Sequence, residues 1–95
     1  MNPGPPPPSF HVDWDQLASD GLIDSFAAYF PSRQGVRVTR AEQIVEYLLG
    51  DDPERNGAPL AEGLFALTVS PLRVRYEIHP SSRLVRVTSV GFFPV

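Results

Sequence analysis

The sequence predicts an α+β domain in which two helices from the first half of the chain pack on a small antiparallel sheet formed mainly by the second half. Between residues 13 and 50, apolar side chains recur at three- and four-residue spacings, which indicates amphipathic helices. From about Gly63 onward, short β-rich runs alternate with tight turns, which indicates strands. Short connections make such neighbouring strands antiparallel. The predicted order is therefore β-α-α-β-β-β.

The chain has 95 residues, of which 42% are hydrophobic, and this length and composition predict one domain with a thin core. Residues 1–9 are dominated by proline and glycine, so we expect a flexible arm there and a single domain over residues 10–95. No apolar run approaches the roughly 18 residues that a membrane-spanning helix needs. No basic segment followed by an apolar run opens the sequence either, so we expect a cytoplasmic protein without membrane contact.

The composition also limits the chemistry of the protein. There is no cysteine, which excludes disulfides, thiolate zinc sites and a cysteine nucleophile. The two histidines, His11 and His79, are far apart in sequence and make a poor metal-binding set. We therefore expect neither a metal nor a cofactor.

The first elements are a strand and a helix. Phe10 to Trp14 alternates apolar and polar side chains, as a short strand does. Asp13 and Gln16 stand at capping-box spacing and predict the start of a helix, which Pro31 ends. The apolar stripe of this helix comprises Ala18, Leu22, Phe26, Tyr29 and Phe30. Residues 32–38 are interpreted as a connector.

The second helix is predicted by another capping box, formed by Thr39 and Glu42. Its apolar residues are spaced so that all share one helix face: Ala41, Ile44, Val45, Leu48 and Leu49. Gly50 suits the position just after a helix. Residues 51–62 are rich in acidic residues, Pro, Gly and Asn, which is typical of a loop.

Three strands follow, over residues 63–69, 72–78 and 83–90, with a turn at residues 79–82. In the middle strand the apolar face comprises Leu72, Val74, Tyr76 and Ile78. Arg73, Arg75 and Glu77 point to the opposite face. If Val85 and Val87 face the core, Arg86 joins Arg73 and Arg75 on the outside.

Charge is distributed unevenly along the chain, although the net charge is only −3. Residues 1–62 carry ten acidic side chains against four arginines, whereas residues 63–95 carry four arginines against Glu77 alone. All cations are arginine, whose planar fork of donors matches phosphate and carboxylate groups. The second half therefore suits an anionic partner.

Three segments together resemble the RelE/ParE toxin superfamily, and the likeness spans residues 40–91. They are Asp52-Pro53-Glu54-Arg55-Asn56-Gly57-Ala58-Pro59-Leu60, Pro71-Leu72-Arg73-Val74-Arg75-Tyr76-Glu77-Ile78 and Leu84-Val85-Arg86-Val87. This resemblance implies the toxin half of a type II toxin–antitoxin pair, which a cognate antitoxin protein neutralises. RelE-like members cleave messenger RNA on the ribosome and so inhibit translation, whereas ParE-like members act on DNA gyrase.

The resemblance also implies candidate site residues. Arg73 corresponds to the middle-strand arginine of the family nucleases, and Arg75 and Arg86 are further candidates for stabilising a charged transition state. His79 is either a proton shuttle or a turn residue without a role, and Tyr76 is expected in the core.

The chain departs from the pattern of the family nucleases after Gly91. Phe92 stands where those nucleases carry a basic residue. Phe92 and Phe93 either pack against a helix or form an apolar patch for a partner. Despite this departure, the primary hypothesis from the resemblance is an endoribonuclease that acts on ribosome-bound mRNA. The alternative is a non-catalytic interaction protein, either directed at gyrase or retaining only antitoxin binding.

Overall fold

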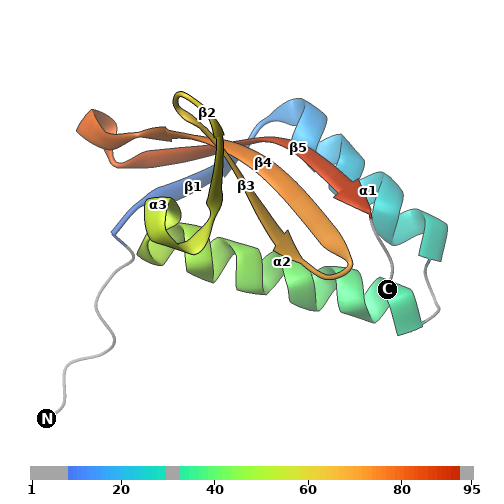
Figure 1. Ribbon diagram of the computed structural model, residues 1–95. Coiled ribbons are helices and arrows are strands. Elements are labelled where there is room, and N and C mark those ends of the chain that lie inside the picture. The colour runs from blue at the N-terminus through green and yellow to red at the C-terminus, as the bar shows by residue number, and fades with distance from the viewer. Residues whose placement is uncertain (1–8, 30–32, 93–95) are drawn as a thin grey trace, which may run out of the picture.

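A computed structural model describes residues 9–29 and 33–92 (Figure 1). The elements in chain order are β1 (His11–Trp14), α1 (Gln16–Tyr29), α2 (Arg33–Asp51), α3 (Pro53–Asn56), β2 (Ala58–Ala61), β3 (Leu64–Val69), β4 (Leu72–His79), a 3-10 turn η1 (Pro80–Ser82) and β5 (Leu84–Phe92). The five strands form one sheet in the order β1-β5-β4-β3-β2.

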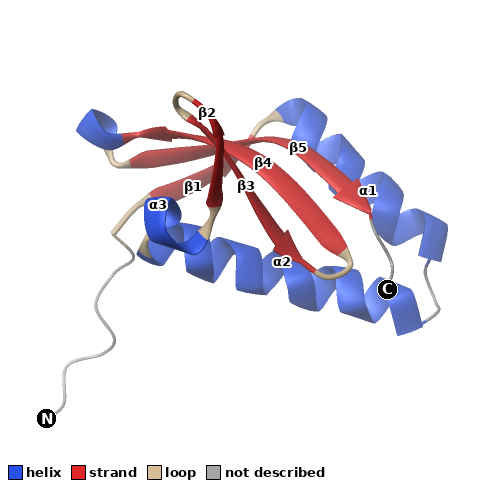
Figure 2. Ribbon diagram, viewed as in Figure 1, coloured by secondary structure: helices blue, strands red, loops and turns tan. Residues whose placement is uncertain are grey.

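Helices α1 and α2 pack on the same face of this sheet, and the opposite face carries neither of them (Figure 2). Ala18 of α1 and Val45 of α2 belong to one buried cluster with side chains of β3, β4 and β5. The strand members of that cluster are Leu67, Val74, Tyr76, Val85 and Val87. The predicted α+β class, with two helices on a small sheet, is confirmed.

The sheet is mixed rather than wholly antiparallel. β2, β3, β4 and β5 pair antiparallel in sequence, as the short connections require. β1 instead pairs parallel to β5, with His11 opposite Leu84 and Trp14 opposite Val87. The whole intervening chain connects these two strands, so no short turn forces them to be antiparallel.

A β-bulge in β5 resolves the irregular alternation of that strand. Tyr76 lies opposite Val87, but the preceding residue of β4, Arg75, lies opposite Ser89, so Thr88 is the extra residue. Before the bulge, Val85 and Val87 point into the core. After it, Val90 packs on the core, and Ser89 turns to the open face.

Three predicted helix boundaries are wrong. Helix α1 is capped by Asp15, whose Oδ1 accepts a hydrogen bond from the Ala18 N–H at 3.0 Å, rather than by Asp13. Helix α2 begins at Arg33, so Thr39 lies inside it and residues 33–38 are not a connector. The reason is Val38, which is buried and continues the apolar stripe by one turn. The helix also runs through Gly50 to Asp51.

The predicted apolar stripe of α2 needs one correction. Ile44 is 42% exposed, whereas Ala41, Val45 and Leu49 are buried. Ile44 lies about 100° around the helix from Val45, which takes it off the face that contacts the sheet.

The segment between α2 and β3 is not a plain loop, because it contains α3 and the edge strand β2. Asp52 caps α3 by accepting a hydrogen bond from the Arg55 N–H at 3.2 Å, and Pro53 occupies the first turn. The hydroxyl of Tyr76 donates to the carbonyl of Pro53. A Cβ at Gly57 would lie 1.8 Å from that same hydroxyl oxygen, so only glycine fits there.

Several predictions fall outside what the structure describes. These are the arm over residues 1–8, the side chains of Phe26, Tyr29 and Phe30, the helix end at Pro31, and Phe93. None of the helices within residues 9–29 and 33–92 has the length and apolar content needed to cross a membrane.

Candidate functional site

Arg73 and Arg75 point away from the helices because they alternate along β4 with buried residues. Their cross-strand neighbours on the open face are small. Thr68 and Gly91 flank Arg73, and Ala66 and Ser89 flank Arg75. Because these neighbouring residues are small, open space remains between the two long arginine side chains.

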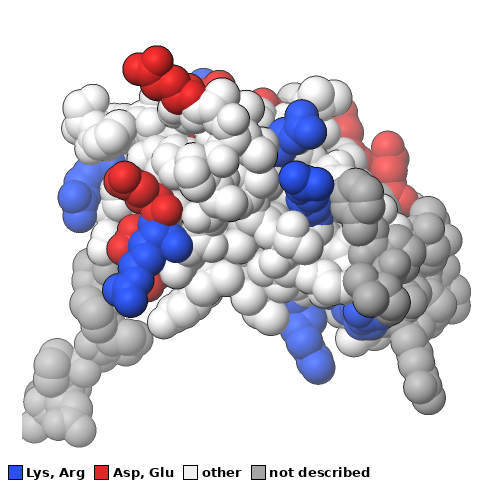
Figure 3. Space-filling view, viewed as in Figure 1, with Lys and Arg blue, Asp and Glu red and all other residues white. Residues whose placement is uncertain are grey.

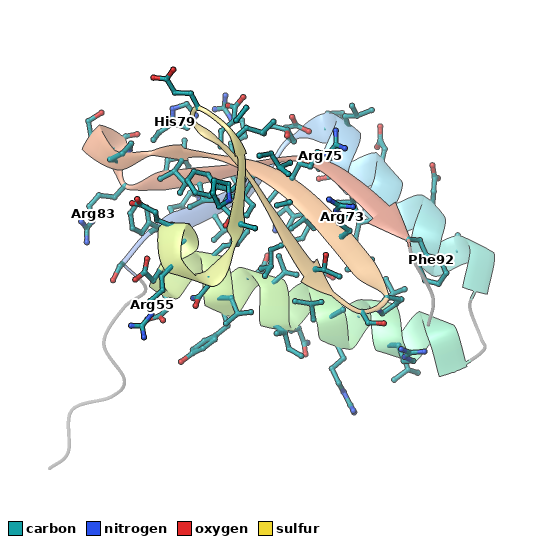
Figure 4. All side chains as sticks on the ribbon, in the orientation of Figure 1. Arg55, Arg73, Arg75, His79, Arg83 and Phe92 are labelled. Atoms are coloured by element: carbon teal, nitrogen blue, oxygen red, sulfur yellow. The ribbon has the colours of Figure 1, made fainter. Side chains whose placement is uncertain are left out.

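That space is a shallow hollow of about 180 Å³, lined by Arg73, Arg75, Ser89, Val90 and Gly91. The bulge at Thr88 brings Ser89 and Gly91 to this face. Figure 4 shows the two arginines next to each other on the sheet, and Figure 3 shows paired basic side chains with uncharged surface beside them. The two arginines with this hollow are called the Arg73–Arg75 site below.

Among the described residues, neither Arg73 nor Arg75 makes an ion pair or a side-chain hydrogen bond. Both guanidinium groups are exposed, so their donors are available to an anion. The hollow supplies these cations and the Ser89 hydroxyl, and its described lining residues include no carboxylate, imidazole or phenol. The donors of the site suit phosphate or carboxylate groups.

Arg86 lies on the same face but in different surroundings. Its Nε is 3.6 Å from Asp13 Oδ2, and its cross-strand neighbour on β4 is Glu77. Glu77 in turn lies 3.3 Å from His79 Nε2. Arg86 therefore belongs to a cluster that contains two carboxylates, and the structure does not bring it to the Arg73–Arg75 site. Figure 4 shows His79 at the opposite end of β4 from Arg73.

Tyr76 is a structural residue, as expected. It is fully buried, its ring stacks on Phe65 with centroids 5.7 Å apart, and its hydroxyl holds Pro53. Burial, with a smaller contribution from the Asp52 carboxylate, raises the pKa of Tyr76 to about 12. A phenol that holds its proton so firmly, on the core side of the sheet, is unsuited to act at the opposite face.

Phe92 packs against a second buried cluster formed by Val38, Ala41 and Leu72. Phe92 stands where the resemblance implies a cation, and it is thus a partly buried apolar side chain packed against the core between sheet and helices. This settles the choice for Phe92 in favour of packing against the helices.

The described residues contain no group of three or more His, Asp or Glu side chains that could hold a metal ion.

Sequence reasoning missed Ser89 and Gly91 as parts of the site. Their signal was the change of period in β5, where Val85 and Val87 are followed by Val90 rather than by an apolar residue at position 89. Such a change within a strand indicates a bulge. Sequence reasoning also missed the pairing of Arg86 with Asp13, because that contact depends on the parallel pairing of β1 with β5.

No protein-family model matches the chain, and no curated protein matches it either. Solved structures do match. In the RelBE2 toxin–antitoxin complex from Mycobacterium tuberculosis, the matched chain is 20% identical with a TM-score of 0.70, over 90% of this chain and 91% of that one.

The chromosomal ParDE system from P. aeruginosa matches with a TM-score of 0.64 at 15% identity, over 90% of this chain and 97% of that one. The intact E. coli RelBE complex matches with a TM-score of 0.56 at 21% identity, over 90% and 99%. The order of elements, the single layer of helices and these similarities agree. The chain therefore has the RelE/ParE-type toxin fold.

Proposed function

We propose that this chain is the toxin component of a type II toxin–antitoxin pair and acts in the cytoplasm by binding an anionic target through the Arg73–Arg75 site. The observation that carries the proposal is the pair of exposed arginines over a hollow, on the face of the sheet that the helices leave open. Two adjacent guanidinium groups beside a hollow that no described acidic residue lines favour phosphate or carboxylate ligands.

The mode of action that the geometry supports best is binding without cleavage, as in a gyrase-directed toxin. General acid–base catalysis needs a proton acceptor and a donor within hydrogen-bond reach of the reacting atoms. No such group lines the hollow within residues 9–29 and 33–92, Tyr76 is buried on the other side of the sheet, and His79 pairs with Glu77. Phe92 supports the same interpretation, because it is an apolar side chain packed against the core.

Cleavage of ribosome-bound mRNA is the second candidate, and the position of Arg73 favours it. Arg73 stands on the middle strand of the sheet, where the resemblance implies an arginine of the nuclease site. In this mode the arginines stabilise the transition-state charge, and the ribosome supplies the missing proton transfer groups.

A cognate antitoxin fits the same face. An acidic segment laid over the Arg73–Arg75 site neutralises both guanidinium groups and blocks the target. The cluster around Arg86 offers no comparable attraction to an acidic segment, because the carboxylates of Asp13 and Glu77 already lie beside that arginine. We therefore place the antitoxin contact over Arg73 and Arg75.

The test is controlled expression in a bacterial host of the wild type, the Arg73→Ala, Arg75→Ala double variant and an Arg55→Ala control. Arg55 is an exposed arginine on α3, away from the hollow. We expect growth arrest with the wild type and the control, and at least a tenfold recovery of viable counts with the double variant. Equal arrest with the double variant, at equal protein levels, would show that the Arg73–Arg75 site is not the functional surface.

Two readouts then separate the modes. Supercoiling by gyrase is measured with purified protein, and ribosome-associated mRNA ends are mapped in arrested cells. Loss of supercoiling without new mRNA ends supports the binding mode. New ends that vanish in the double variant establish the nuclease mode instead.

A further inference from the structure

The outer face of α2 exposes three large apolar side chains. Val36 is 62% exposed, Ile44 is 42% exposed and Tyr47 is 72% exposed. The opposite face of the same helix is buried against the sheet and α1 through Val38, Ala41, Val45 and Leu49. Helix α2 is thus apolar on two sides, and only one of them is covered by the part of the chain that the structure describes.

Two charged residues lie on the same exposed face. At about 100° per residue, Val36, Arg40, Ile44, Tyr47 and Asp51 fall within an arc of about 80°. These five residues are called the outer stripe below. Among the described residues, neither Arg40 nor Asp51 makes a side-chain hydrogen bond or ion pair. The outer stripe therefore ends in an acidic residue and carries an unmatched arginine one turn before its apolar centre.

The order of residues in the outer stripe makes it complementary to itself. Arg40 and Asp51 are equally far from a point between residues 45 and 46, and so are Ile44 and Tyr47. When two copies of α2 cross antiparallel at that point, Arg40 meets Asp51 of the partner subunit twice, and Ile44 meets Tyr47 of the partner subunit twice. A two-fold axis requires this kind of self-complementary surface.

We propose that the outer stripe is a self-association surface, at which a second copy of this chain docks through antiparallel packing of the two α2 helices. Opposite charges meet at both ends of the contact and apolar side chains fill its centre. Two packed helices bury less area than a standard protein interface, so we expect a weak dimer with a dissociation constant on the order of 10 to 100 µM.

The dimer leaves the Arg73–Arg75 site open in both copies. Helix α2 covers one face of the sheet, and the two arginines project from the other (Figure 4). The dimer would present two such sites, on opposite sides of the assembly. A target with two anionic segments then binds more tightly through both sites than through one.

The test is sedimentation velocity of the purified full chain from about 5 µM to 1 mM, a range chosen to bracket the expected dissociation constant. Arg40→Asp places two carboxylates against each other at each end of the contact, and Asp51→Arg places two arginines there. We expect each single variant to raise the dissociation constant at least about tenfold. The variant carrying both changes restores opposite charges and should return to within about threefold of the wild type.

Arg73→Asp is the matched control, because it makes the same change of charge on the opposite face and should leave the dimer unchanged. Far-ultraviolet circular dichroism verifies that each variant is folded. If the wild type stays monomeric up to 1 mM, the proposal is wrong. A helix of another protein would then be the candidate partner of the outer stripe. A dimer that ignores Arg40→Asp, or that the double change does not restore, overturns it as well. The measurement uses neither target nor antitoxin, so it is independent of the proposed function.

Discussion

The two faces of β4 carry different tasks on alternate residues. Leu72, Val74 and Tyr76 are fully buried beneath the helices, and Arg73 and Arg75 stand between them on the open face. The first set makes many contacts within the protein, whereas the second makes no side-chain hydrogen bond or ion pair among the described residues. On this strand, a single residue step separates the residues of the core from the two arginines of the proposed binding site, so we expect that stability and binding can be changed independently.

The largest expected effect on the free energy of unfolding comes from removing a side chain on the buried face. Tyr76→Ala removes a buried ring and its hydrogen bond to Pro53, and we expect it to lower the free energy of unfolding by about 3 to 5 kcal/mol. The neighbouring Arg75→Ala should stay within about 0.5 kcal/mol of the wild type. Urea unfolding followed by circular dichroism measures both. A loss of similar size in Arg75→Ala would remove the distinction between the faces.

A smaller effect should come from crowding the buried face. A Cβ at Gly57 would meet the Tyr76 hydroxyl at 1.8 Å and the ring carbon Cζ at 2.8 Å. We expect Gly57→Ala to cost about 1 to 3 kcal/mol of unfolding free energy. Combining it with Tyr76→Phe, which removes the hydroxyl, should cost less than the sum of the two single changes. Strict additivity in this double-mutant cycle would contradict the close approach.

The smallest effect is expected at the far end of the open face. Arg86 pairs with Asp13 at 3.6 Å, and both side chains are about half exposed, so Arg86→Ala should cost no more than about 1 kcal/mol. The difference from the wild type should shrink in 1 M salt, because exposed ion pairs are screened. In the growth assay Arg86→Ala should remain as toxic as the wild type. Recovery of growth would mean that Arg86 works together with Arg73 and Arg75.

Alternation along β4 was enough to predict from sequence which face holds Arg73 and Arg75, because a strand with one buried face obeys a period of two. The same reasoning placed Arg86 on that face as well, but it could not predict the contact of Arg86 with Asp13. Its partner Asp13 comes from a strand at the other end of the chain, and no local pattern encodes the parallel pairing of β1 with β5. Long-range contacts of this kind lie beyond single-sequence patterns.

The segment after α2 shows a different reason for failure. Pro53 and Gly57 were interpreted as loop residues, but Pro53 opens α3 and Gly57 makes room for the hydroxyl of Tyr76. Proline is common in loops but also suits the first turn of a helix, and glycine is common in loops but also suits a place where another side chain comes close to the backbone. Which of these applies depends on residues that are distant in sequence. In α2, the capping pattern at Thr39 suggested a late start, while burial of Val38 extends the helix towards the N-terminus.

The parallel pairing of β1 with β5 has a consequence for synthesis of the chain. His11 lies opposite Leu84, so the first strand cannot pair until almost all of the sheet has left the ribosome. At the usual speed of translation, residue 84 is made roughly 4 to 15 s after residue 11. During that interval β5 is missing, and with it Ser89 and Gly91, which line the hollow beside Arg73 and Arg75. The hollow beside Arg73 and Arg75 is therefore completed late in translation, after α1, α2 and the first strands of the sheet have been made.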